Sequence, residues 1–420
     1  MQNYVLNGNK DTSVEDFQIR DNLISTLKER FKTYGYKQVR TSTFEYYDLY
    51  STITGTVSQD DMMKVVDSSG KVLVLRPDVT IPITRMISAN RGTLPADLRL
   101  FYVLDVFRQN QEPSDRKETT QAGVEFFGKD TPENNAETIV LAIHTMRDLG
   151  FTNFKLEIGH AGLFKELIKQ TSINEQELEQ LQALIQSKNM AEMNPFLDQL
   201  SIEEDVKSAI RSIPLLYGNP ADIIRQAEAI IQNTEMKNLL KSLVDVYEVL
   251  KDYGEEDALV FNLGLINNMN YYSGIIFQGF VEHVGKPLLM GGRYDNLGEQ
   301  FSSPMPAIGF AFEVDDLLEA HDQEKLWKEK NAPLSILLEY DRDMQRQGFK
   351  LAFQLRKNGW QVLTYPSDHT ASQQTPADCI VHYRGDELQL EAGGKVTTFN
   401  DTDELTGTLS EMGRDDEWHV

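Results

Sequence analysis

The 420-residue sequence is poor in features that mark several common classes of protein. Its single cysteine, Cys379, allows no internal disulfide and excludes a zinc site built from cysteines. No apolar run approaches the roughly 18 residues needed to cross a bilayer, and the stretch from Met1 to Ser13 lacks the apolar core of a signal peptide. We therefore expect a cytoplasmic protein that makes no membrane contact.

Basic residues are also scarce. The chain has 41 Lys and Arg against 65 Asp and Glu, which gives a formal net charge of −24. Binding to a phosphate backbone needs a local basic surface, so this balance argues against a nucleic-acid-binding role, although a basic patch can exist on an acidic protein. The simpler interpretation is that the charge keeps an oligomer soluble.

Motifs for familiar cofactors and metals are missing. The chain has no glycine-rich phosphate loop, no His-Glu-x-x-His and no Gly-x-Ser-x-Gly, and its seven histidines show no metal-ligand spacing. The pairs Gly291-Gly292 and Gly393-Gly394 are too short to indicate nucleotide loops and are typical of turns. We expect no cofactor and no metal.

The length predicts two or three domains. Apolar residues at helical spacing predict a helix over residues 14–34, ended by Gly35. Short apolar runs predict strands of a largely buried sheet, with one helix near residues 136–149. These strands cover residues 72–75, 98–107, 124–127 and 154–158.

The rest of the chain changes character twice. Residues 161–257 are rich in Leu, Glu, Gln and Lys at helical spacing, which predicts a helical insertion. Strand-like sequence returns at 258–264 and 271–281, and a strand followed by a helix over 307–320 closes the first domain, residues 1–320. A charged, proline-ended linker over 321–333 and a small α/β domain over 334–420 are expected to follow.

Three stretches place polar residues inside apolar strand sequence. They are Arg76-Pro77-Asp78-Val79-Thr80, then Phe107-Arg108 with Gln121 to Glu125, and finally Asn270 to Gly274 with Gly291 to Asp295. Buried polar groups need partners. From the pattern alone, these residues either satisfy one another in a structural network or bind a polar ligand.

The same stretches resemble, in order, the signature blocks of histidyl-tRNA synthetase, a class II aminoacyl-tRNA synthetase. The Arg-Pro-Asp-x-Thr segment is similar to that family's amino-group-binding segment, and Phe107-Arg108 with Gln121–Glu125 resembles class II motif 2. Tyr271-Tyr272 and Gly291–Asp295 resemble the histidine-specific blocks, and Gly309-Phe310-Ala311 resembles the start of motif 3. The resemblance covers most of residues 14–320. It implies an α+β fold: a class II synthetase-like antiparallel sheet flanked by helices, with a helical insertion and a small C-terminal α/β domain.

The chain departs from the synthetase pattern where catalysis is carried out. Asn267 stands where the family has a histidine-specific arginine, and Asp316 stands where the motif 3 arginine binds ATP phosphate. Neither side chain supplies the permanent positive charge that these roles need. Gln109 to Asp115, in the motif 2 loop, also lacks most of the expected basic character, and Ser42 replaces a usual proline of motif 1.

The amino-acid side of the pocket departs less. The positions that match histidine-binding residues of the synthetase are Asp78, Thr80, Arg108, Gln121, Glu125, Tyr271 and Tyr272. Retained binding positions with lost catalytic positions resemble the ATP phosphoribosyltransferase regulatory subunit family. That resemblance implies no catalytic residues, a homodimeric core, assembly with a short catalytic subunit into a hetero-octamer, and feedback inhibition by histidine at the start of histidine biosynthesis.

Two other readings remain open from the sequence. An active histidyl-tRNA synthetase would need other groups to replace Asn267 and Asp316. Another noncatalytic class II paralogue could sense amino acids or uncharged tRNA. The acidic C-terminal region argues against tRNA, because residues 333–420 hold eight Lys and Arg against fifteen Asp and Glu.

Overall fold

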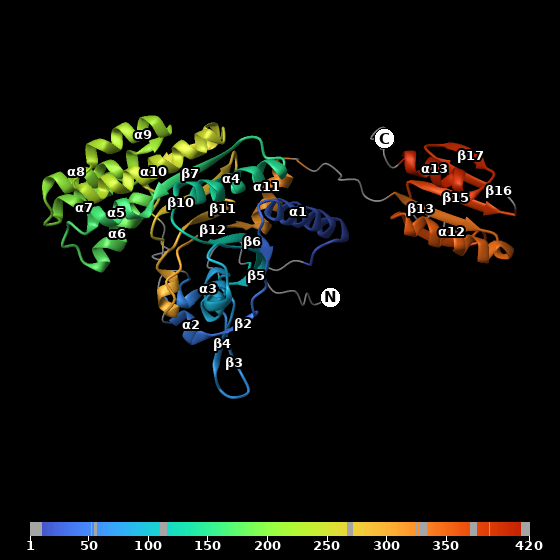
Figure 1. The fold of residues 1–420 in the computed structure, drawn as a ribbon, viewed down its shortest axis with the longest axis horizontal. Helices are drawn as coiled ribbons and strands as arrows, with labels where there is room; N and C mark the ends of the chain where they lie inside the picture. The colour runs from blue at the N-terminus through green and yellow to red at the C-terminus, as the bar shows by residue number, and fades with distance from the viewer. Residues whose placement is uncertain are drawn as a thin grey trace. The chain divides into compact units, whose positions relative to one another are not determined.

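The computed structural model describes residues 11–51, 53, 57–109, 116–266, 272–324, 326, 334–369, 376–385 and 387–412. The chain divides into two compact units, Met1–Leu326 and Trp327–Val420 (Figure 1). No helix among the described residues is long and apolar enough to span a membrane.

A nine-stranded sheet forms the centre of the first unit. Its strand order is β1-β5-β6-β12-β11-β10-β7-β9-β8. Neighbouring strands are antiparallel except for β1 with β5 and β7 with β9, which are parallel. The strands are β1 (Lys37–Gln38), β5 (Leu98–Phe107), β6 (Glu118–Phe127), β7 (Phe154–His160), β8 (Tyr217–Gly218), β9 (Leu259–Asn262), β10 (Ile275–Val281), β11 (Leu289–Arg293) and β12 (Ala307–Glu313).

Three helices pack on one face of this sheet: α1 (Val14–Thr33), α4 (Pro132–Asp148) and α11 (Val314–Gln323). The hydroxyl of Ser13 caps α1, and the chain leaves the helix through Gly35 at φ +78°. The helical spacing predicted this element correctly because apolar side chains four residues apart in its second half all face the core. The buried side chains of α1 are Leu23, Leu27 and Phe31.

The opposite face of the sheet carries a smaller layer. It consists of α3 (Thr80–Asn90) and a three-stranded antiparallel sheet of order β2-β4-β3, with the short helix α2 (Tyr47–Ser51). The strands of this small sheet are β2 (Phe44–Tyr46), β3 (Lys64–Val66) and β4 (Val72–Leu75). Apolar side chains of this layer form a second core with Leu100 and Tyr102, whereas Phe101 between them belongs to the first core. This alternation follows from the two-residue period of a strand.

The insertion after β7 is helical, apart from the short strand β8 that joins the edge of the large sheet. Its helices are α5 (Ala161–Ile168), α6 (Glu175–Gln186), α7 (Met190–Gln199), α8 (Glu204–Ser212), α9 (Pro220–Ala227) and α10 (Thr234–Asp252). Helix α10 packs on α4 and α5, which ties the insertion to the main core. Short 3₁₀ turns of the chain are η1 (Gln59–Asp61), η2 (Arg91–Thr93), η3 (Ile213–Leu215), η4 (Glu228–Ile230), η5 (Glu256–Ala258), η6 (Leu297–Phe301) and η7 (Arg342–Met344).

The second unit is a five-stranded sheet of order β14-β13-β15-β16-β17, in which β13 runs parallel to β14 and β15. Its core joins the strands to helices α12 and α13 through Leu351, Leu355, Leu405 and Leu409. The elements are β13 (Ser335–Tyr340), α12 (Gln345–Lys357), β14 (Gln361–Pro366), β15 (Cys379–Arg384), β16 (Glu387–Ala392), β17 (Lys395–Phe399) and α13 (Thr402–Met412).

Two of the boundaries that differ from the sequence-based expectations lie at the expected linker and beside the third polar block. The expected linker began at residue 321, but α11 continues to Gln323 because His321 is buried and its Nε2 lies 3.0 Å from the carbonyl oxygen of Leu149. Strand β10 begins at Ile275, so Tyr272 and Ser273 precede the strand that was expected to contain them.

Candidate functional site

The loop between β4 and α3 brings the first polar block to the sheet. Arg76 is buried, and its guanidinium donates to the carbonyl oxygens of Asp105 (2.8 Å), Thr41 (3.1 Å) and Ser42 (2.9 Å), so this side chain fixes the loop. Asp78 Oδ1 accepts from the backbone N–H of Ile81 at 2.8 Å, which satisfies one free donor at the start of α3. Arg76 therefore has a structural role. Asp78, two residues later, lines a cavity over the large sheet.

A cavity of about 130 Å³ lies over β6, β11 and β12. One buried water needs roughly 10–15 Å³ measured in this way, so the space admits a ligand of several heavy atoms. Six of the seven predicted histidine-binding residues line it: Asp78, Thr80, Arg108, Gln121, Glu125 and Tyr272. The seventh, Tyr271, and the departed position Asn267 lie outside the described residues.

Glu125 occupies the floor of this cavity. Its Oε1 accepts from Thr80 Oγ1 at 2.8 Å, and its Oε2 accepts from the hydroxyl of Tyr294. Gly309 lies directly opposite on β12, where a Cβ atom would meet Oε2 of Glu125 at 2.0 Å. Burial raises the pKa of Glu125 to about 7, although both hydroxyl donors favour the charged form. The cavity thus contains a carboxyl group whose pKa lies near neutral pH.

Asp78 is the second buried carboxyl of the cavity. Its Oδ2 atom has no hydrogen-bond partner within the described part of the chain, although it is fully buried. Burial raises the pKa of Asp78 to about 6, against the opposing effects of the Ile81 N–H and of Arg108. A buried carboxylate oxygen that accepts no hydrogen bond lowers the stability of the fold, unless a ligand or a water donates to it.

Arg108 and the pair Gln121–Glu313 complete the polar lining. Arg108 Nε donates to the carbonyl oxygen of Pro77 at 2.7 Å, and Gln121 Nε2 donates to Glu313 Oε1 at 2.7 Å. Burial also raises the pKa of Glu313, and Arg108 opposes that rise. Three carboxyl groups with one guanidinium suit a ligand that carries an ammonium group and a carboxylate.

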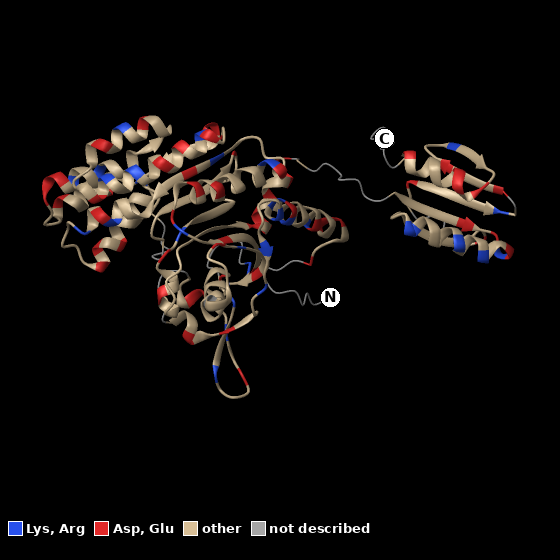
Figure 2. Ribbon diagram, in the orientation of Figure 1, with Lys and Arg blue, Asp and Glu red and all other residues tan. Residues whose placement is uncertain are grey.

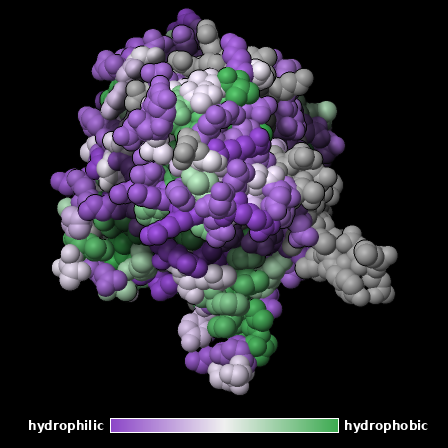
Figure 3. All heavy atoms as spheres, turned by 90° about the vertical axis from the view of Figure 1, so that its right-hand side faces the viewer, coloured by the Kyte–Doolittle hydropathy of each residue, from purple (hydrophilic) through white to green (hydrophobic). Residues whose placement is uncertain are grey.

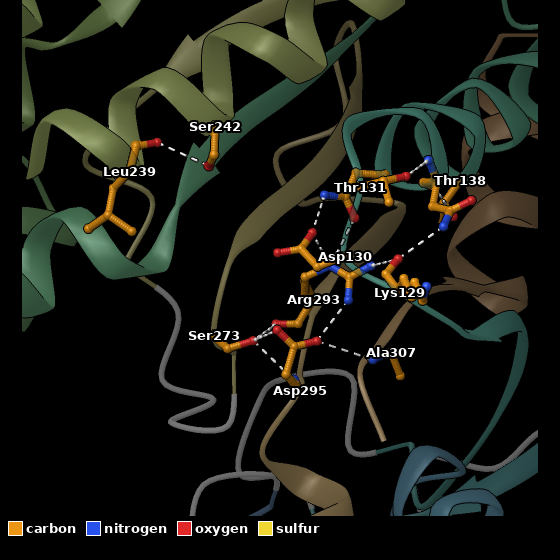
Figure 4. Close-up of polar contacts among 12 residues, drawn as sticks. Lys129, Asp130, Thr131, Thr138, Leu239, Ser242, Ser273, Arg293, Asp295 and Ala307 are labelled. Carbon is orange, nitrogen blue, oxygen red and sulfur yellow. Dashed lines mark hydrogen bonds and ion pairs between the residues drawn. The ribbon is translucent and has the colours of Figure 1, made fainter. Parts of the chain in front are cut away.

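In the third polar block, the segment from Gly291 to Asp295 has a structural role. Arg293 is completely buried, and its Nε lies 2.9 Å from both Asn135 Oδ1 and Asp130 Oδ1, while Nη1 lies 2.8 Å from Asp295 Oδ1 (Figure 4). Asp295 also accepts from the backbone N–H of Ala307, and its backbone N–H donates to Ser273 Oγ at 3.0 Å. The polar blocks therefore differ: the residues around Glu125 line a cavity, whereas those around Arg293 satisfy one another.

Asp316, the second departed position, lies on the first turn of α11. Its Oδ1 accepts from Lys286 Nζ at 2.7 Å and lies 3.8 Å from Arg116 Nη1. Its carboxylate thus pairs with cations of its own chain. In the described residues no group of three or more His, Cys, Asp or Glu side chains is placed to hold a metal ion.

Nine lining residues were not predicted as ligand contacts, among them Tyr102, Tyr294, Glu313 and Pro287. Tyr102 lies within an apolar strand and has the signature of a core residue, and Pro287 lies in a loop. Glu313 could have been found only from strand register, because it lies opposite Gln121 across the β6–β12 pair. That pairing joins positions 192 residues apart in the chain.

Comparison with known proteins gives the family. A family model described as histidyl-tRNA synthetase matches residues 8–317. An ATP phosphoribosyltransferase regulatory subunit of Oceanobacillus iheyensis is 47% identical over 400 residues, which cover 94% of this chain and 96% of that protein. The chain belongs to the family of ATP phosphoribosyltransferase regulatory subunits. A Clostridium botulinum protein of the same name is 35% identical over 84% of each chain.

Solved structures agree with this assignment. A Bacillus halodurans structure described as an ATP phosphoribosyltransferase regulatory subunit/histidyl-tRNA synthetase has a TM-score of 0.81 at 28% identity, covering 92% of this chain and 99% of that one. A histidyl-tRNA synthetase of Nostoc sp. PCC 7120 has a TM-score of 0.82 at 14% identity, covering 98% and 100%, which shows a shared fold. The predicted α+β class II synthetase-like fold is thereby confirmed. As a regulatory subunit by family, the chain is a noncatalytic protein and not an aminoacylating enzyme.

Proposed function

We propose that this regulatory subunit is required for the activity of a short ATP phosphoribosyltransferase catalytic subunit, and that it binds histidine as the feedback inhibitor of histidine biosynthesis. The names of the relatives support the regulatory role. The observation that carries the histidine site is the cavity in which Asp78, Glu125 and Arg108 converge, with Asp78 Oδ2 buried and without a partner among the described residues. The proposal is tested by the rate of phosphoribosyl-ATP formation with and without this chain.

The proposal gives each polar group of the cavity a role. The ammonium group of histidine is placed at Asp78 and Glu125, where two carboxylates compensate its charge, and its carboxylate is placed at Arg108. Gln121 orients the ligand, Thr80 holds Glu125, and the ring of Tyr272 lines the slot for the imidazole. Tyr271 is proposed to line the same slot, on the basis of its position in the sequence alone. Asn267 removes one cation from this side of the pocket, so a modest affinity is expected.

tRNA is not proposed as a partner, although the basic residues of the second unit are not evenly spread. Arg346, Lys350, Arg356 and Lys357 all lie on α12, where Figure 2 shows them along one helix. Residues 333–420 nevertheless carry a net charge of −7. A long polyanion would extend beyond this one helix, about 20 Å long, and would meet acidic surface within a Debye length of about 8 Å.

A homodimeric core is proposed to present two copies to the catalytic subunits, as in the hetero-octamer of the family. The β3–β4 hairpin and β2 expose apolar side chains, visible as green on the lower projection in Figure 3. Soluble monomers rarely leave such a patch uncovered. The exposed side chains are Phe44, Tyr46 and Val65 on one face of the small sheet and Val66 and Val72 on the other.

Replacing Val66 by Glu is expected to dissociate this dimer, because Val66 is 67% exposed in the single chain and a carboxylate would be buried on association. Light scattering of the purified variant should give the mass of one chain. Val396→Glu is the matched control, since Val396 is 60% exposed on β17 of the other unit. A Val66→Glu variant that keeps the mass of two chains would place the dimer interface elsewhere.

A further inference from the structure

Four charged side chains form a rim cluster at the start of α11: Arg116, Lys286, Asp316 and Glu319. Lys286 Nζ lies 2.7 Å from Asp316 Oδ1 and 3.9 Å from Glu319 Oε2. Arg116 makes longer contacts, with Nη1 3.8 Å from Asp316 Oδ1 and Nη2 3.8 Å from Glu319 Oε2. Two carboxylates on one face of a helix thus share the same two cations.

Two chain segments join the rim cluster to the lining of the cavity. Lys286 directly precedes Pro287, which lines the cavity, and α11 directly follows Glu313, which also lines it. The first turn of a helix attracts anions, because its N–H groups lack partners within the helix. Here that turn carries Asp315 and Asp316, and Asp315 Oδ2 already accepts from the backbone N–H of Thr120 at 2.9 Å.

The consequence is that both cations at this edge of the cavity are already paired with carboxylates of the same chain. A phosphate group at this edge would need Lys286 and Arg116, which are paired with Asp316 and Glu319. Each ion pair is partly exposed and therefore weak by itself, but both cations of the rim cluster lie within 4 Å of both of its carboxylates.

We propose that Asp316 and Glu319 are specificity determinants of the cavity. By pairing with Lys286 and Arg116, they exclude phosphate-bearing ligands from its edge, so the cavity takes a free amino acid and not a nucleotide-linked one. That the cavity takes an amino acid rests on the proposed function. That phosphate is excluded rests on the rim cluster alone.

The test is a gain of binding. Inorganic pyrophosphate is titrated calorimetrically into the full chain and into the double variant Asp316→Asn, Glu319→Gln, which leaves Lys286 and Arg116 unpaired. The double variant should bind pyrophosphate at least about tenfold more tightly than the parent, because two freed cations then attract a polyanion. This affinity should fall as KCl is raised.

The matched control is Asp322→Asn, Glu324→Gln, which removes the same charge from the end of the same helix. It should bind pyrophosphate as weakly as the parent. Equal affinity of the parent and the Asp316, Glu319 variant would overturn the proposal, as would an equal gain in the control. If the double variant is unstable, the single variant Asp316→Asn, checked for folding by circular dichroism, removes the 2.7 Å partner of Lys286 and should show a smaller gain in the same direction.

Histidine is titrated into the same three proteins. Loss of histidine binding in the Asp316, Glu319 variant without any gain of pyrophosphate binding would mean that the cluster only supports the loop, and the proposal would be wrong. A parent that binds no histidine, together with a variant that gains pyrophosphate, would contradict the proposed function and leave the phosphate exclusion established.

Discussion

Glu125→Gln is expected to weaken histidine binding by about 10- to 100-fold, the effect of losing one charged hydrogen bond in a buried site. The amide keeps the size of the carboxylate and can still accept from Thr80 at one oxygen. It cannot compensate an ammonium charge. The measurement is calorimetric titration of histidine into the parent and the variant, followed by inhibition of the assembled enzyme.

The pH dependence of histidine binding distinguishes a ligand-binding role of Glu125 from a purely structural one. In the empty cavity, burial places the pKa of Glu125 at about 7 and that of Asp78 at about 6. A cationic ligand binds the ionised carboxylates, so a bound proton must leave first, and affinity should fall as pH falls through 7. In Glu125→Gln the midpoint of this fall should move toward the pKa of Asp78. A variant that only loosened the fold would lower the affinity without moving the midpoint.

Arg108→Ala should also reduce sensitivity to histidine, and both variants must fold, because truncating one side of a buried charge pair can itself cost several kcal/mol. Glu228→Gln is the control for Glu125→Gln, since it makes the same change at an exposed position of the insertion. Variants at Glu125 and Arg108 that fold, assemble and stay as sensitive to histidine as the parent would place the sensor outside the cavity.

Gly309→Ala is expected to have the largest effect on stability. Its Cβ would lie 2.0 Å from Glu125 Oε2 and 2.4 Å from the carbonyl oxygen of Val124, and the second contact is with backbone that cannot rotate away. Strand β12 must therefore separate from β6, at a cost of about 1–3 kcal/mol or more. Thermal unfolding followed by circular dichroism should show a lower midpoint, and histidine binding should fall with the displacement of Glu125.

Gly285→Ala is the matched control, because a Cβ at Gly285 in the same unit meets nothing within 4 Å. Its unfolding midpoint should stay close to that of the parent, since such a surface change is usually worth within about 0.5 kcal/mol. If Gly309→Ala were as stable as this control, the close packing of Glu125 against β12 would be refuted.

The sequence predicted much of the fold because periodicity and ordered motif blocks are local signals. Helix α1 and strands β4 and β5 lie where their apolar spacing indicated. Strand β6 starts six residues earlier than predicted, at Glu118, because its first half carries polar side chains such as Thr120 and Gln121. Helix α13 was not expected, since its eleven residues contain few large apolar groups.

The site was predictable where a polar residue interrupts an apolar strand, as at Gln121 and Glu125. The sequence could not tell which polar residues satisfy one another. Arg293 and Glu125 have the same kind of sequence context, yet Arg293 is enclosed by Asp130, Asn135 and Asp295, whereas Glu125 faces a cavity. Glu313 required the β6–β12 register, which is a long-range property of the fold.

The central claim, that this chain is needed by a catalytic partner, is tested most directly by reconstitution. The short ATP phosphoribosyltransferase catalytic subunit is assayed for phosphoribosyl-ATP formation alone, with this chain, and with this chain plus increasing histidine. The account predicts little activity alone, a rise that saturates as the two chains co-elute in one complex, and a fall with histidine. A catalytic subunit that is equally active without this chain, and that elutes separately from it, would contradict the account.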